Sequence, residues 1–151
     1  MNTEIIPFWK RLDLDEMTHA QWESLCDGCG RCCLRKLEFE DTHEIVYTNV
    51  ACSLLDITLC RCTAYGDRKL RKPECLVLSP ESVRQSLHLL PDTCAYRLVA
   101  QGQDLPWWHH LVCGNTDMVR EAGISVCDKV VSEDYVHEED LEEHIIDWVA
   151  T

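Results

Sequence analysis

A chain of 151 residues, 46% hydrophobic and 27% charged, has the composition of one soluble globular domain, and no apolar run approaches the roughly 18 residues of a membrane span. The formal net charge of −13 excludes the usual basis of nucleic-acid binding, because Lys and Arg must displace counterions from the phosphates. The first residues lack a basic region followed by an apolar stretch, so we expect a cytoplasmic protein without membrane contact, folded as a single domain over residues 1–151.

The first predicted element is a short helix over residues 19–25. Thr18 and Gln21 have the spacing of a capping box, in which each side chain bonds the backbone N–H of the other residue. This helix ends at Cys26, where a dense cysteine motif begins.

The motif CDGCGRCC is predicted to be a loop. Gly28 and Gly30 oppose a continued helix and supply the positive φ of a tight turn. The β-branched and aromatic run EIVYTNV predicts a strand near residues 44–50, which leads to Cys52. Residues 56–75 are short of apolar runs and contain breakers, so we expect loops and turns packed around a site.

Two further helices are predicted after the cysteine-rich segment. In SPESVRQSLHLLP, Ser79 is a suitable N-cap, Pro80 suits the first helical position and the final proline ends the helix. A second helix is predicted over residues 93–101 with Asp92 as its cap, which places Cys94 in the first turn.

The run WWHH at residues 107–110 has two interpretations. Its side chains could line a ligand pocket, but a packed aromatic anchor with exposed histidines is the commoner outcome and is what we expect.

The last predicted element is an amphipathic helix after Ser132. This segment has eight acidic residues and no Lys or Arg, and its apolar residues Leu141, Ile145, Trp148 and Val149 share one helical face. We expect the helix to dock on the protein's own core; a partner-binding helix is the alternative.

The eleven cysteines carry the functional argument. Structural disulfides are rare in a reducing cytosol, where dense cysteines more often bind metal or perform thiol chemistry. A C-x2-C turn brings two thiolates to one metal, and C-x2-C-x2-C also opens ferredoxin-like iron-sulfur runs. Eight cysteines lie between residues 26 and 75, enough for two four-thiolate sites or one cluster with spare thiols: Cys26, Cys29, Cys32, Cys33, Cys52, Cys60, Cys62 and Cys75.

The charge distribution agrees with a thiolate site. Residues 26–75 hold eight acidic and eight basic residues, so the whole net negative charge lies outside them. A solvated mixed-charge surface explains these residues equally well, but their positive charges could offset thiolates. The basic residues are Arg31, Arg35, Lys36, Arg61, Arg68, Lys69, Arg71 and Lys72.

The run LCDGCGRCC, followed by ACSLL, CTAY, Arg68 and Cys75, resembles the CxxCxxCC proteins, a zinc- or iron-chelating domain family. The segments FWK, EMTHAQWESLCDGCGRCCLRKL, TCAYRLVAQG, EAGISV and HIIDW resemble its YcgN-type, YkgJ-like members over nearly the whole chain. This resemblance implies a chelating role for seven of the clustered cysteines, while Cys60 and Cys94 lie in stretches typical of the YcgN type. Cys113 and Cys127 match no motif and are expected to be ordinary buried thiols.

These observations predict a small α+β domain, helix-rich and irregular, organised around a cysteine metal site. The expected ligands bind an iron-sulfur cluster or zinc, with iron-sulfur slightly favoured: Cys26, Cys29, Cys32, Cys33, Cys52, Cys60, Cys62, Cys75 and Cys94.

Three alternatives stay open. One is a cytosolic thiol-redox enzyme using Cys29, Cys32 or Cys33, with Arg31 lowering a thiol pKa. Another is an adaptor acting through its acidic C-terminal helix. The third is an enzyme built on the cluster, since a flagellin lysine methylase has a similar cysteine pattern, although no Gly-rich cofactor loop, G-x-S-x-G or H-E-x-x-H motif is present.

Overall fold

The computed structural model describes residues 5–73 and 75–151, and its regular elements are short. The strands are β1 (Leu34–Glu38), β2 (Ile45–Ala51), β3 (Leu55–Asp56), β4 (Arg61–Cys62) and β5 (Val131–Ser132). The helices are α1 (Phe8–Arg11), α2 (His19–Ser24), α3 (Arg68–Arg71), α4 (Pro80–Val83), α5 (Ala95–Ala100), α6 (His110–Cys113) and α7 (Met118–Glu121). Turns of 3-10 helix connect several of them. This mixture of short helices and strands confirms the predicted α+β class.

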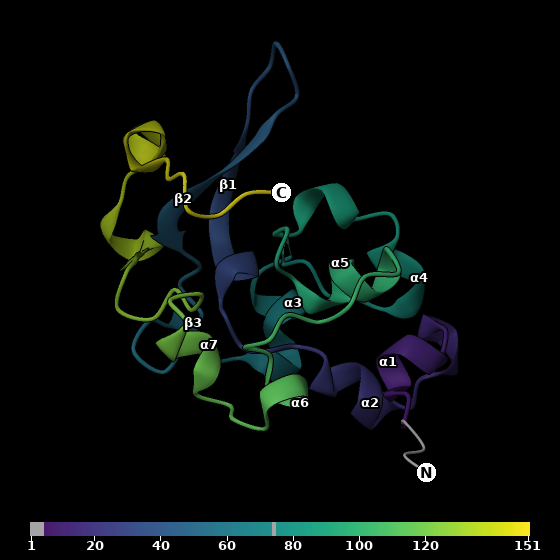
Figure 1. Cartoon of the computed structure of the whole chain (residues 1–151). Helices are drawn as coiled ribbons and strands as arrows, with labels where there is room; N and C mark the ends of the chain where they lie inside the picture. Colours follow the sequence, from purple (N-terminus) through teal and green to yellow (C-terminus); the bar gives the residue numbers. More distant parts are fainter. Residues whose placement is uncertain (1–4, 74) are drawn as a thin grey trace.

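The β1–β2 hairpin projects from the rest of the molecule (Figure 1). Its strands are antiparallel, and β5 adds to β2 in parallel to complete a three-stranded sheet. The C-terminal segment runs along β2, where Thr48 and Ile145 form a bridge and the N–H of Ile146 donates to the carbonyl of Tyr47 at 2.9 Å. Strands β3 and β4 form a separate two-stranded ladder.

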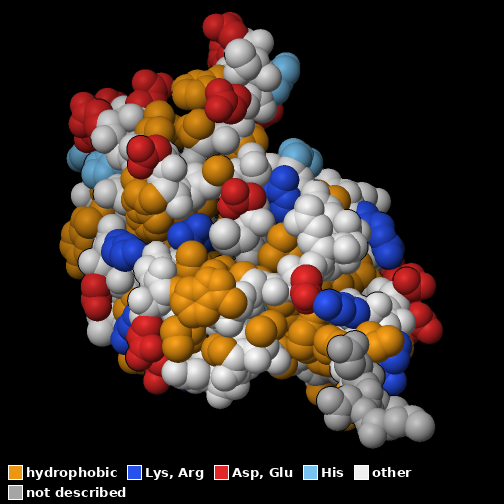
Figure 2. Space-filling view, viewed as in Figure 1, with side chains coloured by type: hydrophobic (Ala, Val, Ile, Leu, Met, Phe, Trp, Pro, Cys, Tyr) orange, Lys and Arg blue, Asp and Glu red, His pale blue; other side chains and the backbone are white. Residues whose placement is uncertain are grey.

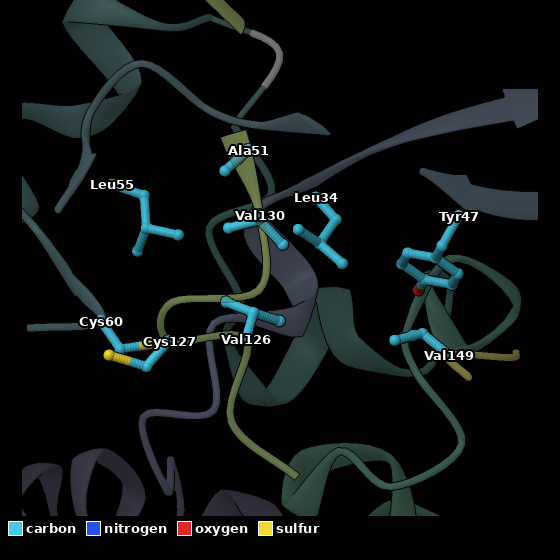
Figure 3. Packing of buried hydrophobic residues seen from close by; sticks show 9 residues of the cluster. All are labelled: Leu34, Tyr47, Ala51, Leu55, Cys60, Val126, Cys127, Val130 and Val149. Atoms are coloured by element: carbon cyan, nitrogen blue, oxygen red, sulfur yellow. The ribbon is translucent and has the colours of Figure 1, made fainter. Parts of the chain in front are cut away.

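Two hydrophobic clusters form the core. The first joins the hairpin to the C-terminal third of the chain, and Figure 3 shows nine of its residues: Leu34, Tyr47, Ala51, Leu55, Cys60, Val126, Cys127, Val130 and Val149. The second lies among the short helices: Leu14, Trp22, Leu25, Val83, Leu90, Ala95, Tyr96 and Leu105. Because residues of both clusters line the same cavity, that cavity lies between the two cores.

Two predicted elements before Cys52 are confirmed. Helix α2 begins with the expected capping box: the Thr18 hydroxyl accepts from the Gln21 N–H at 3.1 Å, and the Gln21 side chain accepts from the Thr18 N–H at 2.9 Å. Strand β2 occupies the predicted place before Cys52. The segment after β3 was expected to form only loops and turns, but it contains strand β4 and helix α3. Strand β4 pairs with β3 in a ladder of two residue pairs.

The helix predicted from Pro80 is much shorter than expected, because α4 ends at Val83. The carbonyl groups at the end of this segment accept hydrogen bonds from side chains of other elements. The Tyr47 hydroxyl donates to the carbonyl of Leu89 at 2.9 Å, and Arg97 donates to that of Leu90 at 2.7 Å. Leu90 is also extended, which the following proline favours.

The next helix, α5, also starts later than predicted. Cys94 is its N-cap and stands before the first turn instead of inside it. The predicted cap, Asp92, lies two residues before the observed N-cap, and its N–H donates to the carbonyl of Ala150 at 2.8 Å.

The predicted C-terminal amphipathic helix is wrong. Residues 133–135 and 138–144 form 3-10 turns, and the chain continues in extended form. Acidic residues four positions apart, such as Glu138 and Glu142, would repel each other on an α-helix. Leu141 and Val149 are nevertheless buried, as the apolar pattern indicated. An adaptor acting through a C-terminal helix has no basis in this fold.

One part of the prediction for the WWHH run is confirmed and another is wrong. Trp108 is a packed anchor, but His109 is fully buried, which contradicts the expected exposure of the histidines. The Nε2 of His109 donates to the carbonyl of Leu25 at 2.8 Å, and its Nδ1 accepts from the N–H of Leu111 at 3.0 Å. His109 thus fixes the chain immediately before Cys26.

Acidic side chains gather at the tip of the projecting hairpin and on the segment beside it (Figure 2). Over the part of the chain that the structure describes, no helix combines the length and apolar character that a membrane crossing requires.

Candidate metal centre

All nine cysteines predicted as ligands line a single cavity of about 540 Å³. They come from the loop after α2, the start of β1, the end of β2, the β3–β4 hairpin, the segment after α3 and the start of α5. The nine are Cys26, Cys29, Cys32, Cys33, Cys52, Cys60, Cys62, Cys75 and Cys94. Cysteines from distant parts of the chain therefore line a common cavity.

The CDGCG loop has the backbone conformation that its glycines predict. Gly28 and Gly30 have φ angles of 73° and 77° and enclose Cys29. The carboxylate of Asp27 accepts from the Cys29 N–H at 3.0 Å, and the Cys29 carbonyl accepts from the N–H of Val126 at 2.9 Å. The loop is thus held locally by Asp27 and over a long range by the chain after α7.

Glu133 fixes the second group of cysteines and was not predicted from the sequence. Its carboxylate accepts from the N–H of Ser53 at 2.8 Å and pairs with Arg35 at 3.4 Å and Lys72 at 3.2 Å. The neighbouring Cys52 N–H donates to the Cys33 carbonyl at 2.8 Å, which joins the two cysteine groups.

The remaining cysteines are positioned by local turns. Cys60 lies between β3 and β4 with a φ of 58°, and its N–H donates to the Asp56 carbonyl at 2.7 Å. Lys69 donates to the carbonyl of Cys75 at 2.9 Å. A basic side chain thus helps to position Cys75 in the cavity wall.

Burial raises the pKa of most of the cavity thiols. The pKa of Cys94 is raised to about 12 and that of Cys29 is also raised, whereas Cys26 and Cys32 are exposed at the surface. A negative charge on Cys32 contributes to the raised pKa of six other cavity thiols: Cys26, Cys29, Cys33, Cys60, Cys75 and Cys94.

Cys32 is the exception, with a pKa lowered to about 7. The main cause is a hydrogen bond from the Cys33 thiol, and the Lys36 ammonium group contributes. Lys36 also donates to the Cys32 carbonyl at 3.3 Å. The expected cation, Arg31, directs its guanidinium group away to the Ile124 carbonyl at 2.7 Å, although its backbone N–H donates to the sulfur of Cys29 at 3.5 Å.

The two cysteines outside the motifs differ from each other. Cys113 is exposed, so the expectation that it is buried is wrong. Cys127 is buried as expected, and Figure 3 shows it beside Cys60 at one end of the first core cluster. The guanidinium group of Arg120 donates to its sulfur.

The described donors of the cavity do not converge on one point. In residues 5–73 and 75–151, no three Cys, His, Asp or Glu side chains are placed so that they could hold a single metal ion. The cavity is nevertheless within the roughly 300–1,000 Å³ of small-molecule sites. The described side chains therefore form no closed four-ligand zinc site, but they surround a space with many sulfur donors.

Comparison with known proteins agrees with this geometry. Residues 25–95 match the CxxCxxCC family, described as a "putative zinc- or iron-chelating domain". A UPF0260 protein of Sinorhizobium fredii is 53% identical over 95% of this chain and 92% of its own length. The chain belongs to the UPF0260 family. Other members from Pseudomonas putida and Marinobacter nauticus are 50% and 54% identical over 97% and 95% of the chain, and over 97% of their own lengths.

The family match coincides with the cavity. Residues 25–95 contain all nine cavity cysteines, whereas Cys113 and Cys127 lie outside the matched range. No solved structure matches the chain. The description of the matched domain and the clustered cysteines of this UPF0260 chain therefore suggest the same function, metal chelation.

Proposed function

We propose that this UPF0260 protein binds a metal centre through the thiolates of its cavity. The observation that carries the proposal is the shared cavity of nine cysteines contributed by separate segments. Their protonated thiols would lose protons when a metal binds, because metal ligation requires thiolates. The proposed ligands are drawn from Cys26, Cys29, Cys32, Cys33, Cys52, Cys60, Cys62, Cys75 and Cys94.

We favour an iron-sulfur cluster over zinc. A structural zinc ion needs four protein donors around one point, and no three described donors have such an arrangement. An iron-sulfur cluster is held by four cysteines spread over several irons, so its protein ligands need not meet at one atom. A wide cavity with dispersed thiols supports this choice.

The basic side chains on the cavity wall would offset the charge of such a centre. Lys36, Arg61 and Arg68 line the cavity together with the cysteines. Nearby cations stabilise thiolates and lower the cost of burying their negative charge. Such a bound cluster would supply electron transfer or structural cross-linking.

Metal analysis of anaerobically purified full-length protein tests the proposal. We expect at least one equivalent of iron per chain, acid-labile sulfide and absorption near roughly 400 nm. Stoichiometric zinc without sulfide would support the chelating function but reject the cluster. Less than about one half equivalent of iron plus zinc would reject metal binding altogether.

A thiol-redox enzyme is the second candidate, favoured by the lowered pKa of Cys32. It predicts metal-free protein in which Cys32 is alkylated fastest near neutral pH. Protection of Cys32 in metal-loaded protein, with release of that protection by a chelator, would contradict it.

We further propose that residues 1–151 act as one domain in the cytoplasm. The cavity wall runs from Trp22 to Glu133, so no separate chelating module can be cut from the described chain without opening it. All eleven cysteines are free, which suits a reducing compartment. Localisation of a fluorescently tagged chain, with limited proteolysis of the purified protein, tests both statements.

A further inference from the structure

Asp27 has a feature that its role in the loop does not explain. One carboxylate oxygen, Oδ1, accepts from the Cys29 N–H at 3.0 Å and stabilises the turn. The other oxygen, Oδ2, is buried and has no hydrogen-bond partner among the described residues. A buried carboxylate oxygen without a partner costs free energy, because it loses its hydration without a replacement.

Asp27 lies on the wall of the cysteine cavity. Cys26 and Cys29, its neighbours in the CDGCG loop, line the same wall. The other buried polar atom without a partner, Nε of Arg97, does not belong to the cavity wall. The unpartnered oxygen therefore belongs to a residue that lines the same cavity as the cysteines.

We propose that Oδ2 of Asp27 is a ligand of the metal centre, beside the thiolates of the CDGCGRCC loop. This inference rests on the proposed metal-binding function and extends the ligand set from sulfur to one oxygen. A metal cation would provide the missing partner of Oδ2, while Oδ1 keeps the bond that shapes the loop.

A carboxylate ligand would make one metal ion of the centre more weakly bound than the others. Thiolate is the softer donor and binds iron in clusters more strongly than carboxylate does. The metal ion held by Asp27 is therefore the one expected to exchange first with a chelator or an added small ligand.

Three variants of the full chain test the inference. Asp27→Asn keeps an oxygen that can accept from the Cys29 N–H but removes the anionic ligand. Asp27→Cys replaces the carboxylate with a thiolate. Glu23→Gln is the matched control, since Glu23 lines the same cavity but already accepts a hydrogen bond from the Tyr65 hydroxyl. For each, metal and sulfide content, absorption and electron paramagnetic resonance spectra, and metal release to a chelator are measured anaerobically.

We expect Asp27→Asn to release metal at least about tenfold faster than wild type, as loss of groups at metal sites commonly does. Asp27→Cys should retain metal with a changed spectrum, and Glu23→Gln should match wild type. Wild-type metal content, spectrum and release rate in Asp27→Asn would overturn the inference.

If Asp27→Asn does not fold, the metal content and spectrum of Asp27→Cys test the inference instead. A wild-type spectrum in Asp27→Cys, or a folded Asp27→Cys protein without metal, would also overturn the inference. Wild-type protein that binds no metal would instead reject the proposed function itself, so the two failures can be told apart.

Discussion

The sulfur of Cys60 lies 2.6 Å from the position that a β carbon on residue 30 would occupy, so only Gly30 leaves room for it. Val126 approaches the same position at 2.7 Å, and Gly30 has a positive φ of 77°. Gly30 therefore serves two needs at once, the turn of the loop and the close approach of the β3–β4 hairpin.

Gly30→Ala is accordingly expected to lower the free energy of unfolding by about 2–4 kcal/mol, through steric overlap and backbone strain together. Gly28→Ala is the matched control, because its φ is also positive but no atom lies within 4 Å of the added carbon. It should cost only about 1–2 kcal/mol. Urea unfolding of both variants measures the difference, and equal losses would contradict the steric argument.

Cys29→Ser is expected to lower both metal content and melting temperature. Metal binding and folding are coupled, so the loss of a buried ligand removes part of the binding energy from the folded state. A drop of about 5 °C or more would be consistent with a loss of a few kcal/mol. Cys113→Ser changes an exposed thiol away from the cavity and should leave both quantities unchanged. Retained metal and stability in Cys29→Ser would show that Cys29 is not a ligand.

Glu133→Ala is expected to loosen the segment that carries Cys52. The Glu133 side chain is only 16% exposed, and its removal breaks the bond from the Ser53 N–H and leaves Arg35 and Lys72 without this partner. We expect a loss of about 1–3 kcal/mol in unfolding free energy and faster alkylation of Cys52 in chelator-treated protein. Glu139→Ala, at an exposed position, is the control. Unchanged alkylation of Cys52 would rule out the positioning role.

Buried His109 should make stability fall at acid pH. Burial lowers its pKa below the ordinary value of 6.5, so the folded protein keeps it neutral while the unfolded chain takes up a proton. The contribution of this residue is therefore complete above about pH 6.5 and declines as the pH falls toward the lower folded-state pKa.

Comparison of wild type with His109→Asn measures this contribution. The stability difference between them should shrink by up to about 1.4 kcal/mol per pH unit below pH 6.5. A difference that is constant from pH 7.5 to 5.5 would disprove the assignment. A comparison of the two proteins is needed because the thiols themselves make metal binding depend on pH.

Local sequence rules predicted the elements whose stabilising contacts are local. The Thr18–Gln21 capping box and the two loop glycines near Cys29 needed no distant partner, and both are confirmed. The nine cavity cysteines could be grouped from their spacing and from family resemblance, although their ligand roles stay predictions.

Contacts between distant residues explain what could not be predicted. The N–H of Asp92 bonds the carbonyl of Ala150, and the carbonyls of Leu89 and Leu90 accept bonds from Tyr47 and Arg97. Glu133 reaches Ser53 across eighty positions. No periodicity or motif reports such pairings, because they depend on how the two cores meet.

The position of Glu133 on the cavity wall has a consequence for biosynthesis. All the cavity cysteines are translated before this residue, and the bond from Asp92 to Ala150 forms later still. On the ribosome the thiols must therefore remain open to the surroundings until nearly the whole chain has emerged. Loading of the proposed centre would then follow translation, and prematurely terminated chains would carry unprotected sulfur.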